Sequence, residues 1–114
     1  MIKIMDEIID EVAVCKIEGK LTGLDGKGQI QEKVRDLIDN KIVTVVLDLT
    51  KVSWIDSTGL GELIASLAST KNKDGNLVLA NLQGPVQSLL KMTNLNQIFD
   101  IYENVEEALD KLKK

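Results

Sequence analysis

The stretch VTVVLDLTKVSWIDSTGLG, residues 43–61, decides the fold of this protein. Residues 43–49 are mostly apolar, with little alternation, which is typical of a central parallel strand covered on both faces. Beyond residue 49, apolar residues recur at the spacing of one helical face, at Leu60, Leu63, Ile64, Leu67 and Ala68. The stretch therefore predicts a buried strand followed by an amphipathic helix, with the sequence WIDSTGLG (54–61) between them.

The same alternation of strand and helix continues along the rest of the chain. Strands are predicted at residues 12–18, 77–80 and 101–102, and helices at 30–38, 84–90 and 104–112, while residues 2–8 can add an edge strand. Asn104 and Glu107 have the spacing of a capping box at the start of the last helix. Repeated β-α units joined by right-handed crossovers generate a parallel sheet. We therefore expect an α/β fold, one domain over residues 1–114, with a mostly parallel sheet of four to five strands and about four helices packed on it.

The composition excludes several classes of catalytic site. The 114 residues include no histidine, so neither a Ser-His-Asp nor a Cys-His arrangement can form, and no imidazole is available to bind zinc. The glycine-rich residues 23–28 match neither the Walker pattern nor the dinucleotide-binding pattern. We expect no enzymatic activity, no cofactor and no metal site.

The net charge and the single cysteine indicate which partners and which cellular compartment to expect. Lysine and arginine total 14 against 18 aspartate and glutamate residues, a net charge of −4, so a nucleic-acid partner is not expected. Cys15 has no internal partner, which fits a reducing compartment, and we expect it to be a small buried or edge-strand side chain. No apolar run exceeds four residues and an acid follows the N-terminus too soon for a signal peptide, so no membrane insertion is expected. These features predict a small cytoplasmic domain.

The segment between the central strand and the following helix concentrates carboxyl, hydroxyl and glycine residues. Asp56, Ser57 and Thr58 are all of types that cap helix N-termini, yet one cap needs only one such residue. Gly59 and Gly61 each cost about 0.8–1.0 kcal/mol relative to alanine inside a helix. Bare backbone at these positions therefore predicts either a close packing partner or an approaching molecule.

Ser57 is the residue of this segment that can carry chemistry. Its hydroxyl is expected where the backbone N–H groups and the partial positive charge of a helix N-terminus converge, which stabilises an added phosphate. Such a phosphate adds a charge of about −1.5 to −2 beside Asp56, so the position suits a reversible electrostatic switch. A nucleophilic role is not favoured because no base lies nearby. A phosphoaspartate site at Asp48 or Asp56 lacks the acidic pair and the lysine that such a site needs.

The same residues carry a family resemblance. Residues 45–49, Val52 and residues 55–61 resemble the signature of anti-sigma factor antagonists, the STAS-domain proteins. The second half resembles that family's typical ending through residues 77–79, 85–86, 89–93, 95 and 98–99. The resemblance extends over residues 12–112, and its most specific part is the sequence DSTGLG at 56–61.

The resemblance implies a phosphorylation switch with two partner proteins. In the family, a serine kinase that is also an anti-sigma factor phosphorylates the serine directly after the aspartate, which is Ser57 here, with Thr58 as a secondary candidate. The unphosphorylated form binds this kinase and so frees a sigma factor to act in transcription; phosphorylation dissolves the complex and a PP2C-like phosphatase restores it. ATP is the cofactor of the kinase, so none is expected here. The implied partner-binding residues are Thr22, Asp25, Asp56, Ser57, Thr58, Gly59, Leu60 and Gly61.

The first loop departs from the family pattern. Members commonly carry Gly-x-Leu-Asp after the early strand, with the acid near the phosphorylatable serine, whereas Thr22 stands at the matching position here. Asp25 can replace that acid only if the loop folds back, and residues 23–28 are expected to form an ordinary mobile loop. The departure leaves open a constitutive STAS adaptor or scaffold, such as a subunit of a lipid-transport ABC complex, in which Ser57 is never phosphorylated. Trp54 is expected to pack, as a bulky hydrophobe does at this position in the family.

Overall fold

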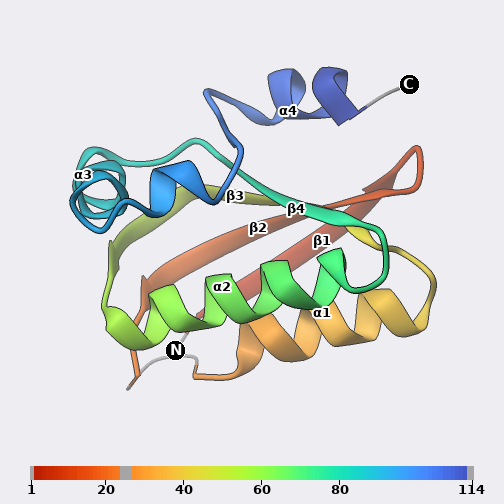
Figure 1. The fold of residues 1–114 in the computed structure, drawn as a ribbon, viewed down its shortest axis with the longest axis horizontal. Helices are drawn as coiled ribbons and strands as arrows, with labels where there is room; N and C mark the ends of the chain where they lie inside the picture. The colour runs from red at the N-terminus through yellow and green to blue at the C-terminus, as the bar shows by residue number, and fades with distance from the viewer. Residues whose placement is uncertain (1, 24–26, 113–114) are drawn as a thin grey trace.

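A five-stranded sheet forms the centre of the fold, and the computed structural model describes residues 2–23 and 27–112 (Figure 1). The elements in chain order are β1 (Lys3–Ile9), β2 (Val12–Leu21), α1 (Gln29–Asp39), β3 (Thr44–Ile55), α2 (Ser57–Lys71), β4 (Asn76–Ala80), α3 (Gly84–Met92), the 3-10 helix η1 (Leu95–Gln97), β5 (Ile101–Tyr102) and α4 (Val105–Leu112). The predicted α/β fold with a mostly parallel sheet is confirmed. The sequence did not predict η1.

The strands lie in the order β1-β2-β3-β4-β5. β1 pairs antiparallel with β2, and all other neighbouring strands pair parallel. Asp10 and Glu11 connect β1 to β2 with φ angles of 49° and 69°, the positive values that a tight hairpin turn requires at both of its central residues. The additional edge strand suggested by residues 2–8 is therefore present, as β1.

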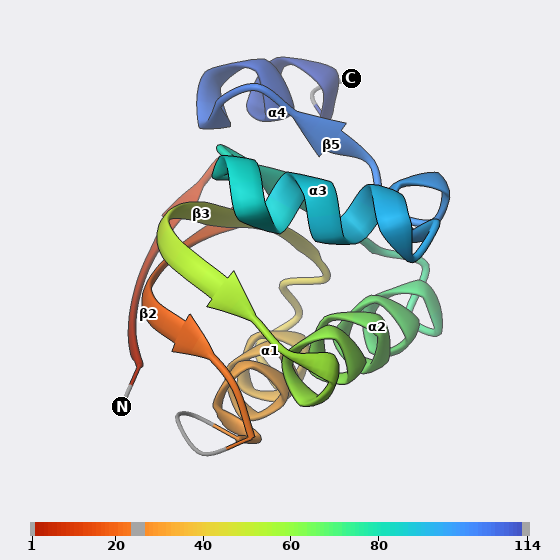
Figure 2. The same cartoon turned by 90° about the vertical axis from the view of Figure 1, so that its left-hand side faces the viewer.

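Helices cover both faces of the sheet. Figures 1 and 2 show α1 and α2 on one face and α4 on the other. In β3, Val45 and Leu47 belong to the larger core cluster, whereas Val46 belongs to a smaller cluster with Ala108 of α4. Successive side chains of a strand point to opposite faces, so a strand that is covered on both faces needs apolar residues at every position. This double cover explains why residues 43–49 are mostly apolar.

β3 extends well beyond the end that the sequence predicted at Leu49. It pairs with β2 as far as Ile55, whereas its pairing with β4 ends at Asp48. Past that point Val52 and Ile55 are buried, whereas Thr50, Lys51, Ser53 and Trp54 are exposed. Two register shifts in the pairing with β2 add a residue to β3 each time, so buried positions three apart can lie on the one covered face. Trp54, which was predicted to pack, is instead 49% exposed on this extension. The motif at residues 56–61 therefore follows the tip of a two-stranded arm of the sheet.

The buried face of α2 differs from the predicted one. Ile64 is 40% exposed and Ala68 is also exposed, although the sequence assigned both to the buried stripe. Glu62, Ser66 and Thr70 are buried in their place. Apolar residues lie on several sides of this helix, so their spacing does not define one face, and α2 packs on α1 as well as on the sheet.

The start of α4 agrees with the sequence. The Asn104 side-chain oxygen accepts a hydrogen bond from the backbone N–H of Glu107 at 2.8 Å, as expected for a helix N-cap. Lys111 is exposed near the helix end, and Lys113 and Lys114 lie outside the described residues. Across residues 2–23 and 27–112, no helix combines the length and apolar character needed to cross a membrane.

Cys15 should be chemically inert in the folded protein. Its side chain is buried in β2, as the sequence predicted, and burial raises the pKa of the thiol to about 12. The reactive thiolate is then almost absent at neutral pH. We expect a thiol-specific dye to leave the native protein unlabelled and to label it rapidly in concentrated guanidinium. A Lys16→Cys variant, with an exposed thiol on the same strand, should react at once and serves as the control.

Candidate functional site

Asp56 joins the start of α2 to the first loop. As the N-cap of α2, it accepts the backbone N–H of Gly59 through Oδ1 at 2.9 Å. Its Oδ2 accepts the backbone N–H of Gly23 at 3.0 Å, and its own N–H donates to the Leu21 carbonyl oxygen at 3.0 Å. The N–H donors of Gly59 and Gly23 hold the pKa of the Asp56 carboxyl below its usual range. The start of α2 therefore carries a carboxylate that is ionised at neutral pH.

The two glycines of the motif serve different purposes. A Cβ at Gly59 would clash with the carbonyl oxygen of Leu21, so a bare backbone is needed for α2 to begin against the end of β2. At Gly61 no described atom beyond the adjoining backbone of α2 lies within 4 Å of the corresponding Cβ position, and the residue is exposed. The sequence predicted a packing partner or an approaching molecule. The packing partner is present at Gly59, and Gly61 has an open surface.

The two adjacent hydroxyl residues have different surroundings. Ser57 is the first residue of α2 and is exposed. Thr58 is half-buried, and its Oγ1 lies 3.1 Å from the position of a Cβ built on Gly23, so its side chain faces the first loop. Leu60, one turn into the helix, is buried in the core and anchors this end of α2. The hydroxyl that is open to a partner protein is therefore that of Ser57.

Glu62 is a residue of this site that the sequence analysis missed. It is 6% exposed, and its Oε2 accepts the backbone N–H of Gly28 at 2.7 Å. Its Oε1 is buried without a hydrogen-bond partner among the described residues. Gly28 is the N-cap of α1, with a φ of 83°, so Glu62 fixes the point where the first loop enters α1. No local signal distinguishes this acid from one on a solvated helix face.

Two carboxyl groups of the α2 segment therefore hold the first loop at both ends. Asp56 holds Gly23 and Glu62 holds Gly28. Thr22, at the position of the family's acid, is half-buried at the start of the loop, and its N–H donates to the Lys20 carbonyl oxygen at 3.2 Å. Asp25 lies outside the described residues. The structure thus brings Thr22 together with the start of α2, and it does not locate Asp25.

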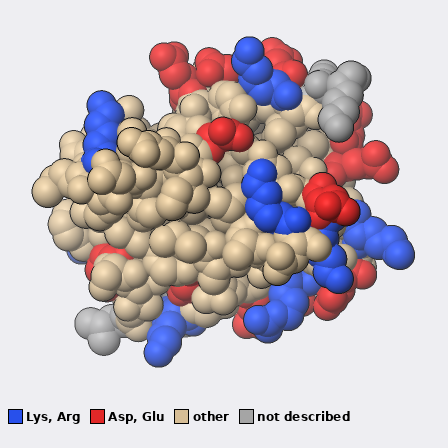
Figure 3. Space-filling view, in the orientation of Figure 1, with Lys and Arg blue, Asp and Glu red and all other residues tan. Residues whose placement is uncertain are grey.

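The charged side chains are unevenly distributed over the face of the molecule in Figure 3. The surface over α3 is mostly uncharged, whereas acidic and basic side chains lie at the top, at the right and along the lower margin. Within the ranges that the structure describes, no group of three or more His, Cys, Asp or Glu side chains could hold a metal ion. The geometry suits recognition by another protein.

Comparison with known sequences decides the family. The pattern of the STAS domain matches residues 3–108. The chain belongs to the STAS domain family. The resemblance recognised in the sequence is therefore confirmed for this domain, from β1 into α4.

Relatives of this STAS domain include named regulators. An anti-sigma-B factor antagonist of Listeria monocytogenes is 38% identical over 68 residues, which cover 60% of this chain and 59% of that protein. The match therefore spans less than two thirds of that relative's length. Proteins with this name are regulatory binding proteins rather than enzymes, which agrees with the expectation of a non-enzymatic domain.

Solved structures share the fold over nearly the whole chain. A candidate anti-sigma factor antagonist from Thermotoga maritima superposes with a TM-score of 0.90 and 25% identity, covering 97% of this chain and 95% of that one. The Bacillus cell fate determinant SpoIIAA in its phosphorylated form gives a TM-score of 0.75 at 20% identity, covering 97% and 100%. The likeness to SpoIIAA is one of fold alone.

Substitution of the two glycines should change stability in opposite directions. Gly59→Ala forces a Cβ against the Leu21 carbonyl oxygen and should lower the free energy of unfolding by about 1–3 kcal/mol. Gly61→Ala adds a methyl group in open space and should raise it by about 0.5–1 kcal/mol. Urea denaturation of both variants measures the difference. Equal effects of the two substitutions would contradict the close approach of α2 to β2.

Replacement of Glu62 should loosen the first loop without weakening the core. In Glu62→Leu the Gly28 N–H loses its acceptor, so the hydrogen exchange of this amide should become about tenfold faster or more. The melting temperature should stay the same or rise, because the substitution removes a buried carboxyl that has only one of its two oxygens hydrogen-bonded. Glu62→Gln keeps a side-chain oxygen for Gly28 and is the matched control. Unchanged exchange in Glu62→Leu would show that the loop is held by other contacts.

Proposed function

We propose that this STAS domain is a cytoplasmic anti-sigma factor antagonist whose binding to a serine-kinase anti-sigma factor is switched off by phosphorylation of Ser57. A PP2C-like phosphatase removes the phosphate and restores binding. The observation that carries the proposal is an exposed Ser57 as the first residue of α2, directly after the ionised Asp56. The names of the relatives support the regulatory role.

The free domain can accept a phosphate on Ser57 without unfolding. The side chain points to solvent rather than into the core, so the phosphate displaces no packed group. The partial positive charge at the N-terminus of α2 offsets part of the repulsion between the phosphate and the Asp56 carboxylate. Phosphorylation therefore changes the charge of the surface while the fold persists.

The same phosphate disfavours a complex that covers this surface. Shifting a partner from 99% bound to 99% free takes a change in binding free energy of about 5.5 kcal/mol. A phosphate of charge about −1.5 to −2, enclosed with Asp56 in an interface without a cationic partner, costs several kcal/mol through lost hydration and repulsion. One phosphate on Ser57, next to the Asp56 carboxylate, is thus of the right magnitude for a switch.

The exposed face of α2 continues from Ser57 along the helix. Ser57, Gly61 and Ile64 are all exposed and follow the i, i+4, i+7 spacing of one helical face. Gly61 lets a partner approach the backbone, and Ile64 offers it an apolar contact. Thr58 faces the first loop instead, so Ser57 is the preferred acceptor of the phosphate and Thr58 the secondary one.

The test is phosphorylation by candidate serine-kinase anti-sigma factors with ATP, followed by site mapping with mass spectrometry. We expect one phosphate on Ser57, no labelling of Ser57→Ala, and full labelling of Ser53→Ala, an exposed serine on β3 that serves as the control. Affinity for the kinase, measured by calorimetry, should fall at least about a hundredfold in the phosphorylated protein, which corresponds to about 2.7 kcal/mol.

Two outcomes would contradict the proposal. If Ser57→Ala is still phosphorylated to the same extent, the acceptor is a different residue. If no kinase labels the protein and it co-purifies stably with a membrane transport complex, the domain acts as a constitutive adaptor.

A further inference from the structure

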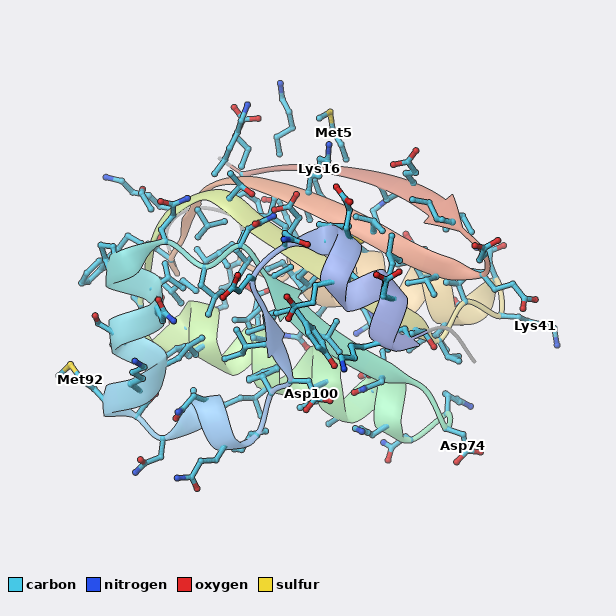
Figure 4. All side chains as sticks on the ribbon, turned by 90° about the horizontal axis from the view of Figure 1, so that it is seen from above. Met5, Lys16, Lys41, Asp74, Met92 and Asp100 are labelled. Atoms are coloured by element: carbon cyan, nitrogen blue, oxygen red, sulfur yellow. The ribbon has the colours of Figure 1, made fainter. Side chains whose placement is uncertain are left out.

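β1 leaves one edge of the sheet open. It is the first strand in the sheet order and pairs only with β2 among the described residues, so the N–H and C=O groups along its other edge have no strand partner in this chain. The strand is seven residues long and contains no proline. Figure 4 shows Met5 at this margin of the sheet, beside Lys16 of β2, and Met5 is 56% exposed. Such an edge is a template for pairing with another strand.

The residues of β1 divide between the two faces of the sheet. Ile4 packs against the core under α1 and α2, and Asp6 accepts a salt bridge from Lys33 of α1 at 3.1 Å. Lys3, Met5 and Glu7 alternate with them and face the opposite side. Lys33 compensates the charge of Asp6 on its own face. The charges of Lys3 and Glu7 are separated by two strand positions, with Met5 between them.

Only a few registers are possible if two copies pair antiparallel through β1. A two-fold axis that joins two antiparallel strands side by side runs perpendicular to the sheet, so residues of the same face come opposite each other. A register centred on Asp6 or on Glu7 places that acid opposite its own copy. A register centred on Ile4 forms no pair of opposite charges.

The register centred on Met5 is complementary. It places Lys3 of each copy opposite Glu7 of the other, so two pairs of opposite charge form, and it places Met5 against its own copy. Ile8, an exposed apolar residue, comes opposite Ile2 just before the strand. Within one copy, Lys3 of β1, Glu18 of β2 and Lys51 of β3 lie side by side across the sheet. Glu7 of the second copy lies next to Lys3 in this row, so positive and negative charges alternate across the junction.

We propose that this chain forms a symmetric dimer in which β1 pairs antiparallel with β1 of a second copy, in the register centred on Met5, so that the two sheets join into one. The occupant of the edge is therefore another molecule of the same protein. The proposal does not depend on the phosphorylation switch, since it rests on β1 alone.

Disulfide trapping tests the register. Met5→Cys places two thiols opposite each other on the axis, with a Cα separation of about 4.5–5.5 Å, which a disulfide can span. Lys16→Cys is the matched control, because it is exposed on the same face but lies on β2, about 14 Å from its copy. We expect mild oxidation to convert Met5→Cys to a covalent dimer at least about tenfold faster than Lys16→Cys. The native Cys15 is buried and does not compete.

Charge reversal tests the pairing without a covalent link. Sedimentation of the wild-type chain should show a mass that rises with concentration from 12.6 kDa towards twice that value. Glu7→Lys makes both cross-strand pairs repulsive and should weaken the dimer at least about tenfold, and the double variant Lys3→Glu/Glu7→Lys should restore it. Circular dichroism of each variant checks that the monomer is folded.

Three results would overturn the proposal. The first is a monomer at every concentration, with equal oxidation rates for the two cysteine variants; the edge is then free for a strand from another protein. The second is a dimer that the double charge reversal fails to restore. The third is a covalent dimer that forms equally fast from Lys16→Cys, which would place the contact on another surface.

Discussion

The carboxylate of Asp56 is the interaction on which the functional end of this molecule depends. One oxygen caps α2 through the N–H of Gly59, and the other holds the first loop through the N–H of Gly23. These two bonds fix the direction in which α2 leaves β3 and the position of the loop beside it. Ser57 follows Asp56 directly, so the same constraint that orients the helix also sets where its first hydroxyl is presented. The ionised carboxyl stabilises the fold by accepting these two hydrogen bonds. In the proposed switch its negative charge also lies beside the phosphate on Ser57.

The start of α2 is exposed because β3 extends beyond the end of β4. The part of β3 that lies between β2 and β4 is covered on both faces, and its central residues Val45, Val46 and Leu47 are all buried in the core. The part beyond Leu49 pairs with β2 alone and carries the motif away from the centre of the sheet. A residue at the tip of such an arm can be anchored from below by Leu60 and still face solvent. The open edge belongs to β1, the first strand of the order, whereas the motif follows β3 at its centre, so the two surfaces use different strands.

α2 shows how much a helix pattern leaves undecided. Apolar residues surround much of this helix, so several faces could have been buried, and the face that is buried in the fold carries Glu62, Ser66 and Thr70. Ile64 is therefore exposed, and it extends the helix face that begins at Ser57. Glu62 is buried instead, and its carboxyl forms the second point of attachment for the first loop. Neither result follows from residue spacing, because both depend on which neighbour the helix meets.

The sequence by itself determined the fold class, the edge strand, the capping of α4 and the strand-to-helix position of the DSTGLG motif. These features follow from local rules: the two-residue and 3.6-residue periods, the turn residues and the side chains that cap helices. Only the tertiary structure decided that Ser57 is open while Thr58 faces the loop, that Gly59 is needed for packing while Gly61 is free, and that Trp54 is half exposed. Each of these depends on contacts between residues that are distant in the chain, such as Leu21 with Gly59, and no local pattern encodes the distance between them.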